Sequence, residues 1–193
     1  MDMTTEAALR RLLDRQDILD CITRYCRGVD RFDRDLLLSA YHPDAVDDHG
    51  TFVGSPEDFW EWVQNIHGAE QLRTMHSIAN HTCDIDGDIA HAETYCLYFG
   101  SNRDHTVDFC GNRYIDRLER RDGVWKIAVR VCVVDFFAPL ADPSIMPEYF
   151  RKAMHELMNN APAGRSREDA SYMRPLTVER EERVSPKHEM PVD

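Results

Sequence analysis

The feature of this sequence that most constrains its fold is a change of hydrophobic period after Gly68. Before this glycine the apolar residues recur every three or four positions, as in helices, and after it they alternate with a period of two, as in strands. The predicted strands are Thr74–Ile85, Ile89–Ser101, Val107–Arg120 and Val124–Phe137. Their connections are short, and two of them, Asp86-Gly87-Asp88 and Asp122-Gly123, are typical of hairpins, so neighbouring strands should be antiparallel. This order predicts an α+β fold in which N-terminal helices cover a curved sheet and enclose a cavity.

The segment before Gly68 is predicted to be mainly helical. The strongest helix should begin after a cap at Asp14 and run to about Arg31, because apolar residues repeat between them at helical spacing. The other predicted helices are a shorter one from about Thr5, one over Arg34–Ala40 and one from Ser55-Pro56. The stretch Ala45–Val53 alternates weakly around a turn at His49-Gly50.

The length of 193 residues is sufficient for one domain with a real core and too short for two of ordinary size. We expect this domain to occupy residues 1–140. The remainder, residues 141–193, is predicted to form a helix over Pro147–Asn159 and then an extended tail, because Ala161–Asp193 is rich in Pro, Arg, Glu and Ser. The tail is equally compatible with disorder, with a lid over the cavity and with an arm that wraps a neighbouring subunit.

The charge of the chain restricts its partners. A net charge of −12 repels nucleic acid and anionic lipid, so we expect neither to be a partner, whereas a small hydrophobic ligand remains compatible. No apolar stretch is long enough to span a bilayer, and the first twenty residues carry charges where a signal peptide has an apolar core. Cytoplasmic residence is therefore the expectation.

The cysteines and histidines do not predict a metal site. None of the six cysteines forms a C-x-x-C pair, and all lie in apolar segments, which favours buried thiols over disulfides. The one acidic cluster that includes a histidine, Asp44, Asp47, Asp48 and His49, is interpreted as a solvated turn in preference to a metal site. A glycine-rich phosphate loop that would hold a nucleotide is also absent from the sequence. A histidine beside a carboxylate transfers protons without a metal or cofactor, so no cofactor is expected.

Four motifs carry a resemblance to a known family. They are Asp17-Ile18-x3-Ile22-x2-Tyr25-x4-Asp30, Tyr41-His42-Pro43-Asp44-Ala45, Met75-His76 and Val124-Trp125-Lys126-Ile127-x2-Arg130. Together they resemble the SnoaL-like group of the nuclear-transport-factor-2-like superfamily over about Thr5–Leu140. The resemblance implies a cone-shaped α+β barrel with a curved mixed sheet, and a homodimer or homotrimer. The more specific similarity is to the lyases of the superfamily, such as scytalone dehydratase, bile-acid dehydratase and dehydrochlorinase.

This resemblance implies a cofactor-independent β-elimination, either dehydration or dehydrohalogenation, of a hydrophobic cyclic molecule of the steroid, aromatic or polyketide type. His76 is then the base, Asp30 orients its imidazole, and Tyr25 donates to a leaving group or a carbonyl. Arg130, if it points inward, would stabilise a developing anion. The other candidate substrate-binding residues are His49, Tyr95, Asn112, Phe59 and Trp60.

Several alternatives stay open at this level. Five residues along an ideal helix place Tyr25 and Asp30 about 140° apart, so they share a site only if the cavity is broad or the helix ends near Gly28–Asp30. Strand alternation puts Arg130 opposite Trp125 unless a bulge reverses the register. The same cavity also suits an isomerase or a cyclase, and a chain without catalytic activity would be a ligand-binding module or the small subunit of a ring-hydroxylating dioxygenase.

Overall fold

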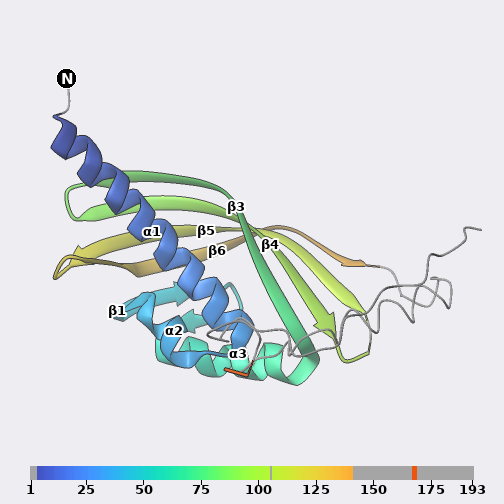
Figure 1. Cartoon of the computed structure of the whole chain (residues 1–193). Helices are drawn as coiled ribbons and strands as arrows, with labels where there is room; N and C mark the ends of the chain where they lie inside the picture. Colours follow the sequence, from blue (N-terminus) through green and yellow to red (C-terminus); the bar gives the residue numbers. More distant parts are fainter. Residues whose placement is uncertain (1–3, 105, 141–166, 169–193) are drawn as a thin grey trace, which may run out of the picture.

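The computed structural model describes residues 4–104, 106–140 and 167–168, and within them it contains three helices and six strands (Figure 1). The helices are α1 (Thr5–Arg31), α2 (Arg34–Ser39) and α3 (Pro56–Glu70). The strands are β1 (Tyr41–Asp48), β2 (Val53–Gly54), β3 (Gln71–Asp86), β4 (Ile89–Asn102), β5 (Val107–Arg121) and β6 (Val124–Leu140). The α+β prediction is confirmed. The predicted helix Pro147–Asn159 and the predicted tail lie outside the described residues, apart from Arg167 and Glu168.

The six strands form one mixed sheet in the order β2-β1-β6-β5-β4-β3. All neighbours are antiparallel except β1 and β6, which run parallel. The hairpin between β5 and β6 turns at Asp122 and Gly123, which both have positive φ (52° and 78°), as a two-residue type I′ turn requires. Strands β2 and β3 are the two edges of the sheet, so the cone is open along one side.

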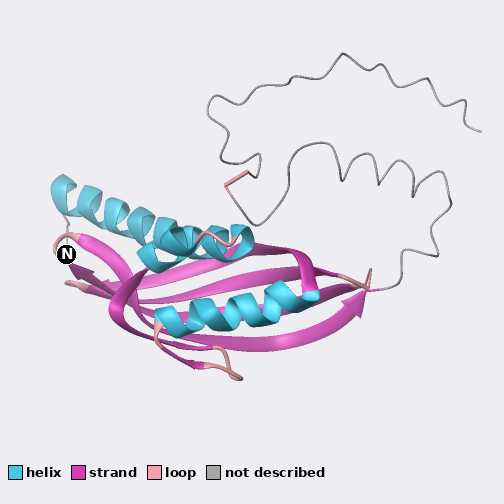
Figure 2. Ribbon diagram, turned by 90° about the horizontal axis from the view of Figure 1, so that it is seen from below, coloured by secondary structure: helices cyan, strands magenta, loops and turns pink. Residues whose placement is uncertain are grey.

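The helices cover one face of the curved sheet. Figure 2 shows α1 and α3 lying over the same face, which we call the inner face. The core fills the space between them, with Ile18, Ile22 and Val29 of α1 fully buried together with Leu118 and Ile127 of the sheet. Among the described helices, none is long and apolar enough to cross a membrane.

Helix α1 is one continuous element of 27 residues, so the prediction that Asp14 caps a second helix is wrong. The hydroxyl of Thr4 caps α1 by accepting a hydrogen bond from the backbone N–H of Ala7 (3.3 Å). The carboxylate of Asp14, inside the helix, instead accepts from Arg120 and from the indole N–H of Trp125, both at 2.9 Å. These contacts attach α1 to the β5–β6 hairpin.

Gly28 does not end the helix either, because α1 continues to Arg31. The glycine permits a close approach of α2: a Cβ at position 28 would lie 2.6 Å from the backbone nitrogen of Leu37. The chain leaves the helix at Phe32, whose φ of 50° is left-handed.

Strand β6 contains a bulge that changes which of its residues face inward. Val129 pairs with Arg117 and Ile127 pairs with Leu118, so Ala128 is the extra residue. The bulge reverses the alternation, and Arg130 therefore lies on the same buried face as Trp125 and Ile127.

The opposite face of the sheet carries exposed apolar side chains. Strand register places two half-buried rings, Phe99 and Phe109, next to a set of exposed residues on neighbouring strands: Met75, Tyr95, Leu97, Ile115, Val131 and Phe136. The rings of Phe99 and Phe109 stack with centroids 4.8 Å apart, and the ring of Phe136 lies over Gly111. We call this set the outer apolar face.

Candidate active site

His76 of β3 and Asp30 of α1 form a direct pair on the inner face. The Nδ1 atom of His76 lies 2.6 Å from one carboxylate oxygen of Asp30, and the backbone N–H of His76 donates to the other oxygen at 2.9 Å. A carboxylate only accepts, so Nδ1 carries the proton and Nε2 is left as the basic nitrogen. Two hydrogen bonds to one residue also hold the imidazole in one orientation.

The environment keeps Asp30 ionised. Burial raises the pKa of this carboxyl, but its electrostatic interaction and its hydrogen bonds with His76 outweigh that effect, so its pKa lies below the ordinary value. Both side chains are well shielded, with 6% of His76 and 11% of Asp30 exposed. The pair is therefore an imidazole supported by a buried anion, which stabilises a proton gained at Nε2.

His76 faces an apolar pocket with a volume of about 180 Å³ between the helices and the inner face. The pocket is lined by Tyr25, Val29, His49, Phe59, Trp62, His67, His76, Tyr98, Cys110, Asn112, Tyr114, Cys132 and Val134. Asp30 is not among these residues and lies behind His76. Tyr25 and Asp30 therefore need not share a face of α1, because the ring of His76 connects the carboxylate to the pocket.

Strand β1 and the turn after it supply a second imidazole–carboxylate pair to the same pocket. The Nδ1 atom of His49 is hydrogen-bonded to Asp47, and the hydroxyl of Tyr41 donates to the other oxygen of Asp47. On its far side, Nε2 of His49 lies 3.2 Å from the hydroxyl of Tyr25. Asp47 is fully buried, so the interpretation of its cluster as a solvated turn is wrong for Asp47. Asp44 is exposed and paired with Arg121 but lies within β1, and Asp48 accepts a hydrogen bond from the backbone N–H of Gly50 in the turn.

Arg130 is buried beside the pocket and does not line it. Its Nε and Nη2 atoms each donate to Asp116 at 2.7 Å, and neither side chain is exposed. The guanidinium carbon lies 4.0 Å from the ring centre of Tyr25 and 4.1 Å from that of Tyr114. The predicted direct contact with substrate is not seen, and the cation instead supports two aromatic walls of the pocket.

The remaining predicted substrate-binding residues divide into two groups. Phe59 and Asn112 line the pocket, as does His49. Trp60 packs against Phe32 with ring centres 5.8 Å apart, outside the pocket. Tyr95 belongs to the outer apolar face and is 43% exposed, so it does not reach the pocket.

Seven residues of the pocket wall were not identified from the sequence: Val29, Trp62, His67, Tyr98, Cys110, Cys132 and Val134. Tyr98 pairs with His76 in the β3–β4 register, and their rings are 5.0 Å apart. Its hydroxyl donates to the side-chain oxygen of Gln71 (2.5 Å), which also lies 2.6 Å from Nδ1 of His67. The register set by the turn at Gly87 would have placed Phe99 opposite His76; a register shift between Ile78 and His81 brings Tyr98 there instead, so the sequence held no signal for this contact.

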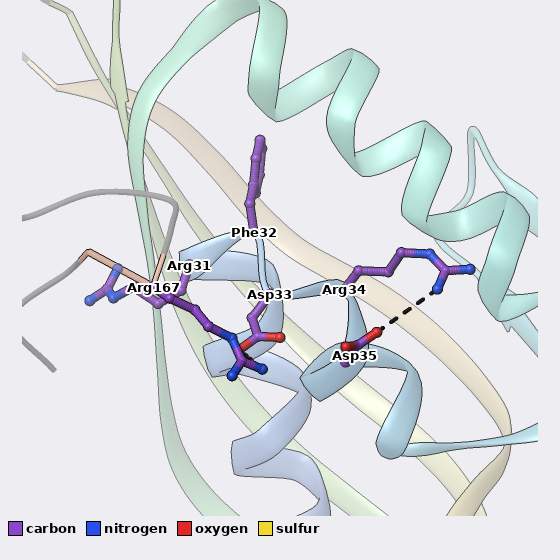
Figure 3. Close-up of a pocket in the computed structure, with 6 residues that line it drawn as sticks. All are labelled: Arg31, Phe32, Asp33, Arg34, Asp35 and Arg167. Carbon is purple, nitrogen blue, oxygen red and sulfur yellow. Dashed lines mark ion pairs between the residues drawn. The ribbon is translucent and has the colours of Figure 1, made fainter. Parts of the chain in front are cut away.

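A larger hollow lies at the turn between α1 and α2 (Figure 3). It has a volume of about 380 Å³ and is lined by Arg31, Phe32, Asp33, Arg34, Asp35 and Arg167. Its charged side chains pair with one another or with neighbours: Arg167 lies 3.8 Å from Asp33, and Arg34 lies 4.0 Å from Asp35 and also contacts Glu57. This hollow contains neither a histidine nor a thiol, so the smaller pocket is the better candidate for acid–base chemistry.

The described residues contain no group of three or more His, Cys, Asp or Glu side chains that would hold a metal ion. All six cysteines are free thiols, and four of them are buried. Burial raises the pKa of Cys132 to about 12 and that of Cys96 to about 11. These thiols are therefore protonated at neutral pH and behave as apolar wall and core atoms.

Comparisons with known proteins bear on the domain type and the fold. The profile of the SnoaL-like domain matches residues 10–131. A solved hexachlorocyclohexane dehydrochlorinase (LinA) of type 2 is 26% identical with a TM-score of 0.66, covering 73% of this chain and 98% of its own. The LinA-type3 dehydrochlorinase from Novosphingobium barchaimii LL02 is also 26% identical with a TM-score of 0.66, covering 72% of this chain and 99% of its own.

A more distant structure shows the fold alone. It is a protein from Novosphingobium aromaticivorans DSM 12444 that its name assigns provisionally to the scytalone dehydratases. It is 17% identical with a TM-score of 0.62, covering 72% of this chain and 97% of its own. No curated protein matches the chain at a significant level.

Proposed function

The chain belongs to the SnoaL-like domain family, and from that premise we propose that it is a lyase that catalyses β-elimination without a cofactor. The observation that carries this proposal is the His76–Asp30 pair at the wall of an apolar pocket. The likeness to dehydrochlorinases at 26% identity supports lyase chemistry in general.

In the proposed reaction, Nε2 of His76 removes a proton from one carbon while a leaving group departs from the next. Asp30 stabilises the imidazolium that forms, because its buried carboxylate already accepts the Nδ1–H hydrogen bond. A base positioned in this way typically contributes ~10²–10⁴ in rate. The apolar walls limit the access of water that would otherwise compete for the imidazole.

The size of the pocket narrows the class of substrate. Its volume of about 180 Å³ is below the ~300–1,000 Å³ of sites for drug-sized ligands. A compact molecule with one substituted ring suits this space better than a steroid. Phe59, Trp62 and Tyr114 provide flat apolar walls for such a ring.

The first prediction is that the purified chain, without partners, eliminates acid halide or water from one-ring substrates with a hydrogen on the neighbouring carbon. Mass spectrometry should show a product lighter by HCl from chlorinated cyclohexanes or by H₂O from cyclic ketols. A product of unchanged mass would instead identify an isomerase. Tight binding without turnover, or copurification with a large iron–sulfur subunit, would contradict the lyase proposal.

We also propose that the outer apolar face is covered by another copy of the chain, because its contiguous exposed apolar residues are unfavourable in water. Light scattering should then give two or three times the chain mass of 22.4 kDa. Leu97→Asp places a charge in the middle of this face and should release monomers, whereas Leu12→Asp, on the exposed side of α1, should not. A wild-type mass of one chain would contradict the proposal.

A further inference from the structure

Two imidazole–carboxylate pairs of the described residues face the pocket, and the proposed proton abstraction involves only His76 and Asp30. The second pair, His49 and Asp47, lies on the β1 side of the pocket and contacts the hydroxyl of Tyr25. Tyr25 is itself a lining residue, so the chain of contacts runs from a buried carboxylate through an imidazole to a hydroxyl at the pocket wall. Nothing in the base mechanism requires this arrangement.

Asp47 is placed to stabilise a proton on His49. Its carboxylate is fully buried and has hydrogen bonds to His49 and to the neutral hydroxyl of Tyr41. The buried guanidinium of Arg130 is engaged in two hydrogen bonds with Asp116. His49 is therefore the group through which Asp47 acts, and Nε2 of His49 lies toward the oxygen of Tyr25.

The surroundings of Tyr25 show why such a partner is useful. Burial raises the pKa of this phenol well above its ordinary value, although the charge of Arg130 acts in the opposite direction. A free phenolate at this position is therefore costly. Tyr25 can donate its proton only if another proton reaches its oxygen in the same step, and His49 at 3.2 Å is placed to supply it.

We propose that Asp47, His49 and Tyr25 form a proton relay that protonates the leaving group, opposite the base His76. This inference rests on the proposed elimination. His76 takes the proton from carbon, the C–H electron pair becomes the new double bond, and the C–O bond breaks with its electrons going to oxygen. That oxygen takes the hydroxyl proton of Tyr25 and leaves as water, while Tyr25 takes the Nε2 proton of His49. Positive charge moves from His49 to His76, and solvent resets both.

The contribution of the relay should depend on the leaving group. Hydroxide is a poor leaving group and needs the proton, whereas chloride departs as a stable anion and does not. Two substrates with the same carbon skeleton and different leaving groups therefore distinguish the effect of the relay on the rate from the effect of the base. 3-Hydroxycyclohexanone and 3-chlorocyclohexanone both give cyclohex-2-enone, which is followed by its ultraviolet absorbance.

His49→Asn and Tyr25→Phe are expected to lower kcat for the hydroxy ketone by ~10² or more, and for the chloro ketone by less than about tenfold. His76→Ala should lower both rates strongly. Trp62→Phe, which changes the pocket wall without touching the relay, should affect both substrates alike. Thermal unfolding of each variant shows whether the fold is kept.

Equal losses for the two substrates in His49→Asn, with His76→Ala still inactive, would overturn the relay and leave the proposed lyase standing. Activity that survives His76→Ala, or a wild-type protein that converts neither ketone, would instead overturn the proposed function. The two failures are therefore distinguishable.

Asp47 is a positioning residue in this scheme, and the rates for the two ketones test it. Asp47→Asn removes the carboxylate charge that stabilises a proton on His49, so it should lower kcat for the hydroxy ketone much more than kcat for the chloro ketone. A merely structural role would lower both rates alike, and that result would exclude the relay.

Discussion

Replacing His76 with alanine is expected to reduce kcat for elimination by ~10²–10⁴, whichever leaving group the substrate carries. The loss follows because no other described basic nitrogen is held by Asp30, whose two oxygens both accept from His76. The pocket wall loses one ring and keeps its other walls, so product should still bind. Steady-state kinetics with both cyclohexanones and calorimetry with cyclohex-2-enone measure the two effects separately.

Two controls make this test specific. His91→Ala removes an exposed histidine from β4 and should leave kcat unchanged. Asp30→Asn keeps the shape of the side chain but removes the charge that stabilises the imidazolium, so it should lower kcat with little change in product binding. Unchanged turnover in His76→Ala would remove His76 from the mechanism, and with it the proposed lyase.

The second large effect concerns stability. Arg130→Met should lower the free energy of unfolding by about 3–5 kcal/mol, because it leaves the carboxylate of Asp116 buried and without its cation. The variant also removes the cation packed between the rings of Tyr25 and Tyr114. Urea unfolding followed by tryptophan fluorescence measures the change.

A double variant distinguishes loss of the ion pair from loss of packing. Arg130→Met combined with Asp116→Leu should recover most of the lost stability, since both charges leave the core together. Arg121→Met, which breaks surface pairs with Asp44 and Glu119, should leave the unfolding curve nearly unchanged. A similarly small effect of Arg130→Met would mean that water reaches Asp116.

The elements that depend on local patterns were predictable. The four long strands each contain the predicted segment with a few more residues at the ends, because strand alternation and hairpin turns are properties of adjacent residues. Helix α3 begins at Pro56, as proline at the first position predicts, with Ser55 as its cap. The prediction of a cap at Asp14 was wrong because its partners Arg120 and Trp125 are more than a hundred residues away.

The candidate site was predictable only in part. The resemblance named Tyr25, Asp30 and His76. In the structure His76 is hydrogen-bonded to Asp30, and His76 and Tyr25 line the same pocket. Their catalytic roles stay predictions. Trp60 was chosen where Trp62 lines the pocket, because two residues on a helix point about 200° apart and the sequence does not orient the helix.

The long strands, their hairpins and the helices that precede them were readable from the residues alone, because they follow from short-range periodicity and turn motifs, whereas Asp30 and His76 were named through the family resemblance. Three features became visible only in the folded chain: Asp47 is buried beside His49, Arg130 turns inward and Tyr95 turns outward. A single bulge, such as that at Ala128, reverses the facing of every later residue in its strand, and a carboxylate can pair with a partner from an element distant in the chain.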